Sequence, residues 1–94
     1  MPTMLEAAHS FVYAGTRLNV YHANKGEGLP QHSHVYNHAT FCAAGSCVVR
    51  HEKGETVVTK NTQPINLLAP KWHEIEALED GTVFINVFSE EHQG

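Results

Sequence analysis

The sequence predicts an all-β protein, either a sandwich or a closed barrel, and three observations support this prediction. Short alternations of apolar and polar residues recur along the chain, which is typical of strands with one buried face. Gly, Pro, Asn and Asp residues separate these alternations at short intervals. No clear apolar pattern with the helical period extends beyond the first few residues. Because many short strands in one open sheet would leave exposed edges, we expect a sandwich or a barrel.

Four turn signals divide the chain into the segments that we expect to be strands. They are the segment 24–28 (Asn-Lys-Gly-Glu-Gly), Lys53-Gly54, Pro70-Lys71 and the segment 79–81 (Glu-Asp-Gly). These residue types readily adopt the backbone conformations that turns require. In chain order, the expected strands are Ser10–Tyr13 and Arg17–Ala23 before the first turn; Leu29–His34, His38–Ala44 and Ser46–Glu52 before the second; Glu55–Lys60 and Ile65–Ala69 before the third; Trp72–Leu78 after it; and Thr82–Phe88 after the fourth.

The length of the chain predicts one domain, over residues 1–94, with a barrel core at about 10–88. The terminal segments 1–8 and 90–94 are expected to be poorly ordered. A single core of this size is only marginally stable, so a bound metal or a partner subunit would add useful stability. We therefore expect an oligomer, most simply a homodimer.

Composition excludes several classes of partner. Six basic and ten acidic residues give a formal charge of −4, and no run of Lys or Arg forms the basic stripe that nucleic acids require. The first residues lack the pattern of a secretory signal, and no apolar run approaches the length of a membrane span. The expectation is a cytoplasmic protein without nucleic-acid or membrane partners.

Two cysteines are too few for a disulfide scaffold. Cys42 and Cys47 are five positions apart, so on one extended segment their side chains would face opposite sides. They also lack the C-x-x-C spacing that a zinc site would normally use. We expect two reduced thiols.

Four histidines form the most informative pattern. On a strand, residues i and i+2 point to the same face, so His32 and His34 can direct two imidazoles at one point. His38 follows after a three-residue gap that allows a turn, and His73 lies far along the chain. Imidazole suits Mn, Fe, Co, Ni, Cu and Zn, whereas Mg and Ca prefer oxygen. We therefore predict a divalent transition metal bound by His32, His34, His38 and His73.

The spacing of these histidines resembles the first motif of the cupins, G-x5-H-x-H-x3,4-E-x6-G. Here Gly26, His32, His34, His38 and Gly45 match every interval, with histidine in place of the glutamate. The second motif, G-x5-P-x-G-x2-H-x3-N, is matched at the histidine by residue 73, but its Pro and Gly positions are not matched and alanine stands at the asparagine position. The resemblance spans about residues 17–88. It implies a double-stranded β-helix, the jelly-roll or cupin barrel, with the metal inside its mouth, as in the four-histidine group of small cupins.

Four neutral ligands would leave the full 2+ charge on the metal centre, which favours anionic ligands. The resemblance implies dioxygenase or oxidoreductase activity on a small organic substrate. Two other functions remain open: a metal Lewis acid in an isomerase or lyase, and a non-catalytic protein that binds or senses a small molecule. A Lewis-acid enzyme needs a base near the metal, and the candidates for a catalytic group are Tyr36 and Cys42.

Strand alternation also predicts a substrate pocket. If His73 points inward, Ile75 does too, whereas Glu74 and Glu76 point outward on the wrong face for base catalysis. On the last strand, an inward set would form an apolar wall near the metal, consisting of Val83, Ile85 and Val87. An outward aromatic set would then form a subunit interface, consisting of Trp72, Phe84 and Phe88. The remaining histidines are interpreted as surface or hydrogen-bonding residues: His9, His22, His51 and His92.

Overall fold

The computed structural model describes residues 3–32, 37–67 and 72–89, and this part of the chain is all-β. Its strands are β1 (Thr3–Met4), β2 (His9–Tyr13), β3 (Thr16–Ala23), β4 (Glu27–His32), β5 (His38–Ala44), β6 (Ser46–His51), β7 (Gly54–Thr59), β8 (Ile65–Leu67), β9 (His73–Ala77) and β10 (Thr82–Ser89). All nine expected strands are present, with ends that differ by one or two residues where the structure describes them. The strand β1 was not expected.

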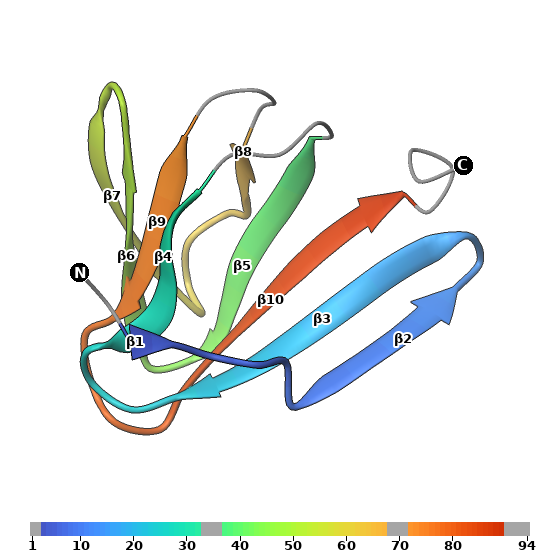
Figure 1. Ribbon diagram of the computed structural model, residues 1–94, viewed down its shortest axis with the longest axis horizontal. Coiled ribbons are helices and arrows are strands. Elements are labelled where there is room, and N and C mark those ends of the chain that lie inside the picture. Colours follow the sequence, from blue (N-terminus) through green and yellow to red (C-terminus); the bar gives the residue numbers. More distant parts are fainter. Residues whose placement is uncertain (1–2, 33–36, 68–71, 90–94) are drawn as a thin grey trace.

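The strands form two five-stranded sheets (Figure 1). The β9 sheet has the order β1-β4-β9-β6-β7, and the β10 sheet has the order β2-β3-β10-β5-β8. From β4 onward the chain passes repeatedly from one sheet to the other, which is the jelly-roll arrangement that the resemblance to the cupins implied. All pairings are antiparallel except that of β1 with β4.

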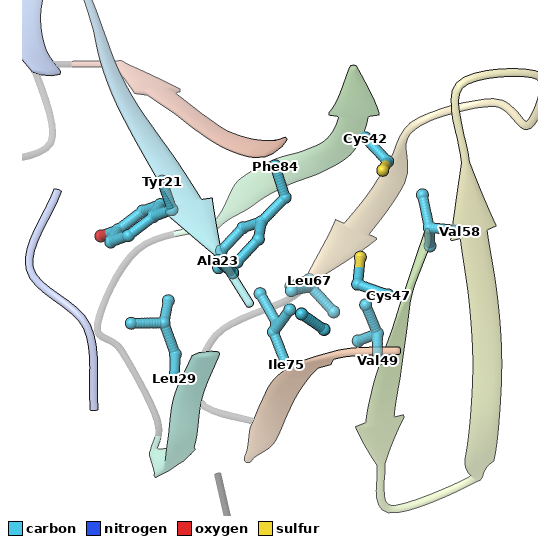
Figure 2. Packing of buried hydrophobic residues seen from close by; sticks show 11 residues of the cluster. Tyr21, Ala23, Leu29, Cys42, Cys47, Val49, Val58, Leu67, Ile75 and Phe84 are labelled. Carbon is cyan, nitrogen blue, oxygen red and sulfur yellow. The ribbon is translucent and has the colours of Figure 1, made fainter. Parts of the chain in front are cut away.

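The core lies between the two sheets, where side chains from β3, β5 and β10 meet those from β4, β6, β7 and β9 (Figure 2). Phe84 and Ile75 are the largest fully buried hydrophobic side chains described, and the ring of Tyr21 stacks on Phe84 at 4.8 Å. Leu5 and Ala7 pack against this core, so part of the N-terminal segment is ordered against it, contrary to expectation. Burying these apolar groups supplies the main favourable free energy of folding.

The structure corrects the predicted orientation of β10. Phe84 and Asn86 point into the core, with 0% and 6% of their surface exposed. The three predicted wall residues lie on the opposite face of the strand and are half-buried: Val83, Ile85 and Val87. The prediction failed because β10 has apolar residues at both alternate sets of positions, so the sequence pattern alone could not select the inward set.

The expected orientation of the two cysteines is also wrong. Cys42 is in the β10 sheet and Cys47 is in the β9 sheet, because the chain changes sheets at Gly45, where φ is +71°. Both side chains are buried, and Figure 2 shows their sulfur atoms directed toward each other. They are free thiols, as expected.

Candidate metal centre and adjoining pocket

His38 and His73 meet in the interior at one end of the sandwich. Each is the first residue of its strand, β5 in one sheet and β9 in the other, and they are 5% and 2% exposed. Their Nε2 atoms are 3.2 Å apart, and their rings meet edge to face at a centroid distance of 5.0 Å. Two imidazoles that are 35 positions apart in sequence therefore present nitrogen atoms to the same point.

This distance fits two ligands of one metal ion. Two nitrogen atoms at about 2.1 Å from a shared metal lie about 3.0 Å apart at a right angle and about 3.4 Å apart at a tetrahedral angle. A direct N–H···N hydrogen bond between neutral imidazoles has a similar length, so the pair is also stable without a metal. The donor set, neutral imidazole without a carboxylate, suits a transition metal.

The structure describes less of the other two predicted ligands, His32 and His34. The backbone of His32 lies directly opposite His73 in the pairing of β4 with β9. His34 is outside the described residues, and so is Tyr36, one of the two candidate catalytic residues. Among the side chains that the structure describes, no group of three or more potential ligands forms. Ligation by all four histidines thus stays a prediction.

Thr40 and Asn86 support His38, and the sequence analysis did not select either of them. The Thr40 hydroxyl donates a hydrogen bond of 2.7 Å to Asn86 Oδ1 and lies 3.4 Å from His38 Nδ1. Because that hydroxyl has one hydrogen, it can only accept from the imidazole, which places the His38 proton on Nδ1. The lone pair of His38 is then on Nε2, the atom that faces His73. Strand alternation could have found Thr40, since it shares the face of His38.

A pocket of about 210 Å³ lies beside strand neighbours of the histidine pair, although neither His38 nor His73 is among its described lining residues. It is smaller than the roughly 300–1,000 Å³ of sites that bury drug-sized ligands, so it suits a small molecule. Two of its lining residues are strand neighbours of the pair: Leu67 lies opposite His38, and His51 lies opposite His73. The described lining consists of His51, Glu52, Lys53, Ile65, Asn66, Leu67 and Trp72.

This pocket differs from the one that the sequence predicted. Of the four predicted pocket residues, only Ile75 points inward, and it is completely buried in the core. The expected aromatic interface is also wrong: Phe84 is buried, and Trp72 lines the pocket. The Nε2 atom of His51 lies 3.3 Å from Thr56 Oγ1, as expected for a hydrogen-bonding residue, and His51 also lines the pocket, which was not expected.

Cys42 does not reach the histidine pair. It is four residues from His38 along β5, which corresponds to about 13 Å. Burial raises the pKa of its thiol, and burial raises the pKa of Cys47 to about 12. Both groups therefore stay protonated at neutral pH and are poor nucleophiles and bases.

Glu74 and Glu76 point outward, as their alternation with His73 predicted. Both are bound by Arg50, with N–O distances of 2.6 and 2.8 Å, and Arg50 also contacts Glu55 at 2.9 Å. These three hydrogen bonds raise the pKa of the Arg50 guanidinium. The carboxylates thus stabilise the outer surface of the β9 sheet and take no part in the interior site.

Comparison with solved structures identifies proteins of similar fold. A protein from Neisseria meningitidis, NMB1881, has a TM-score of 0.70 and 11% identity, over 86% of this chain and 79% of that one. A cupin protein (BF4112) from Bacteroides fragilis has a TM-score of 0.66 and 18% identity, over 80% of this chain and 65% of that one. The capsular polysaccharide assembling protein CapF from Staphylococcus aureus has a TM-score of 0.63 and 17% identity, over 83% of this chain and 26% of that one.

At these identities the likenesses establish the fold alone, and this chain has the jelly-roll fold of the Bacteroides cupin. It spans less than two thirds of that protein and about a quarter of CapF. No family model matches the sequence, and no curated protein matches it either. Within the described part of the chain, no helix has the length and apolar character needed to cross a bilayer.

Proposed function

We propose that this protein binds one divalent transition metal through His32, His34, His38 and His73, and that it catalyses oxidation of a small organic molecule by an oxygenase-type reaction. The proposal rests mainly on the buried His38–His73 pair, whose Nε2 separation of 3.2 Å suits a shared metal. A bound transition metal would supply redox chemistry and Lewis acidity.

The described residues would perform three tasks at this site. Thr40 fixes the orientation and tautomer of His38, as derived above. Ile65, Leu67 and Trp72 exclude water from one side of the pocket and pack on the apolar part of a substrate. Lys53 lies at the same pocket and can bind an acidic group of the substrate, but Glu52 lines the pocket too, so the preference for an anion comes from the charge that four neutral ligands would leave on the metal.

The metal site is tested by elemental analysis of protein purified without an affinity tag. The expected result is close to one transition-metal ion per chain, with occupancy reduced at least tenfold in His73→Ala and in His38→Ala. The exposed His22, changed to Ala, is the matched control and should retain wild-type occupancy. Equal occupancy in His73→Ala and in the wild type would refute the site.

A second candidate, a Lewis-acid isomerase or lyase, is favoured by His51. This imidazole lines the pocket beside His73 and could accept a proton from a bound substrate. Activity assays with a panel of small carboxylic acids and ketones, after loading with zinc or with iron, separate the two candidates. Zinc has no redox chemistry, so turnover with zinc supports the Lewis-acid reaction, whereas turnover with iron alone, coupled to oxygen uptake, supports oxidation.

A further inference from the structure

Among the residues that the structure describes, the outer face of the β10 sheet is apolar and carries no formal charge. Cross-strand pairing places side chains from four strands on this face, because directly opposed residues of an antiparallel pair share a face. We call this set the apolar outer face: Phe11, Tyr13, Leu18, Val20, Ala39, Phe41, Val83, Ile85 and Val87. The polar residues of the same face, His9, Thr16, His22, Asn66 and Ser89, have no formal charge either.

Two other surfaces of the protein show what a solvated sheet face looks like here. The outer face of the β9 sheet carries the ion-paired group of Arg50 with its three glutamates. The β2–β3 hairpin extends beyond the β9 sheet (Figure 1), and on its inner face Arg17 donates to Ser10, which donates to Asn19. The opposite face of the same hairpin carries Phe11, which is 50% exposed. The apolar composition is therefore specific to one face.

The sequence of β10 indicates that both its faces are buried in the functional protein. A strand with one solvated face alternates apolar and polar residues, whereas β10 is nearly continuous in apolar residues, Thr-Val-Phe-Ile-Asn-Val-Phe-Ser. The described chain covers one face only, since all of its strands belong to the two sheets. Phe84 is completely buried on the inner face, whereas Ile85 is only half-buried on the outer one.

The size of this face fits an interface between subunits. The four strands that carry the apolar outer face have 5, 8, 8 and 7 residues, which at about 3.4 Å per residue and about 4.8 Å between strands give a projected area of roughly 450 Å². Side-chain relief makes the accessible area larger, so the face suits an interface somewhat smaller than the standard one, in which each partner buries roughly 800 Å². Contiguous apolar patches of this size are at the upper end of what monomers expose.

We propose that two copies of this chain pack their apolar outer faces against each other, sheet on sheet, around a two-fold axis. A two-fold interface brings the same patch of each copy together, so the patch must be self-complementary. The uncharged described residues of this face help to meet this condition, since pairing the two faces brings no like charges into contact, although each chain carries a formal charge of −4. The central residue is Ile85, whose strand neighbours on either side are Val20 and Phe41.

The test is sedimentation equilibrium of the full chain over a concentration series. The wild type is expected at twice the chain mass of 10.4 kDa, and Ile85→Lys is expected to weaken association at least a hundredfold. Val57→Lys is the matched control: Val57 is 54% exposed on the outer face of the β9 sheet, and its replacement should leave the dimer unchanged. Circular dichroism establishes that each variant is folded.

If Ile85→Lys does not fold, Phe11→Lys on the projecting hairpin replaces it and should weaken association at least tenfold. The proposal is overturned by a wild type that is monomeric up to about 1 mM. It is also overturned by a dimer that survives the folded outer-face variant, or by one that dissociates on Val57→Lys instead. Metal content does not enter any of these results, so the proposed function is tested separately.

Discussion

At the scale of single residues, the site depends on how His38 is held. Thr40 is completely buried and connects the imidazole to Asn86, so two polar side chains in the interior depend on one hydroxyl. Groups that hydrogen-bond to a metal-binding imidazole set its tautomer and orientation, and their loss commonly weakens metal binding about 10- to 100-fold.

We therefore predict that Thr40→Val, which keeps the side-chain shape and removes the hydroxyl, weakens metal affinity at least about tenfold. It should also lower the free energy of unfolding by about 1–3 kcal/mol, because Asn86 Oδ1 loses its buried donor. Thr40→Ser retains the hydroxyl and should bind metal like the wild type. Competition with a chromophoric chelator measures the affinities, and equal affinity of Thr40→Val and Thr40→Ser would contradict the role of the hydroxyl.

At the scale of elements, the turn between β5 and β6 takes the chain from the β10 sheet to the β9 sheet, so that residues before and after it enter the core from opposite sides. Gly45 adopts a φ of +71°, and a Cβ at this position would lie 2.5 Å from Thr82 Oγ1 and 2.9 Å from Thr82 Cα. Both the conformation and the close approach require glycine. This position was selected in the sequence by its spacing from His38, and the structure supplies the physical reason for it.

Gly45→Ala is expected to lower the free energy of unfolding by at least about 2 kcal/mol, from backbone strain and from the contact with Thr82. Gly15→Ala is the control, because φ is +77° there and a Cβ would meet nothing within 4 Å. Backbone strain alone should lower the free energy of unfolding of Gly15→Ala by about 1 kcal/mol. Urea denaturation measures the free energy of unfolding of both variants. An equal decrease in the two would mean that Thr82 moves aside without an energetic cost.

At the scale of the whole molecule, a metal held between the two sheets would join them. His38 belongs to the β10 sheet and His73 to the β9 sheet, so binding at both would favour the folded chain over the unfolded one. A ligand at about 100 times its dissociation constant adds about 2.7 kcal/mol to the stability of a protein.

Removal of the metal with a chelator should therefore lower the Tm of the wild type by about 10 °C or more, given that 1 kcal/mol shifts the Tm of a domain this size by about 4–8 °C. The double variant His38→Ala, His73→Ala provides the comparison, because its Tm should not respond to the chelator. Thermal unfolding followed by circular dichroism gives both values. A wild-type Tm that is unchanged after complete removal of the metal would argue against a site that joins the sheets.

The strands themselves could be predicted from the sequence, because alternation and turn residues are local properties. All nine expected strands are present, and β5 has the predicted bounds His38–Ala44. The strand β1 was missed, since two residues are too few to show a period and its partner β4 is distant in sequence. The metal-ligand set was predicted from spacing, and the structure brings together two of its members, His38 and His73.

The sequence by itself determined which segments are strands, and it predicted which histidines share a metal, because both inferences rest on spacing along the chain. Only the tertiary structure decided which face of β10 points inward, how the two cysteines meet, and that His51 lies beside His73. These outcomes depend on which sheet each strand joins and on the register between strands. Contacts between distant segments set both, and because each alternate set of β10 contains large apolar residues, the local pattern does not select the inward set until those contacts form.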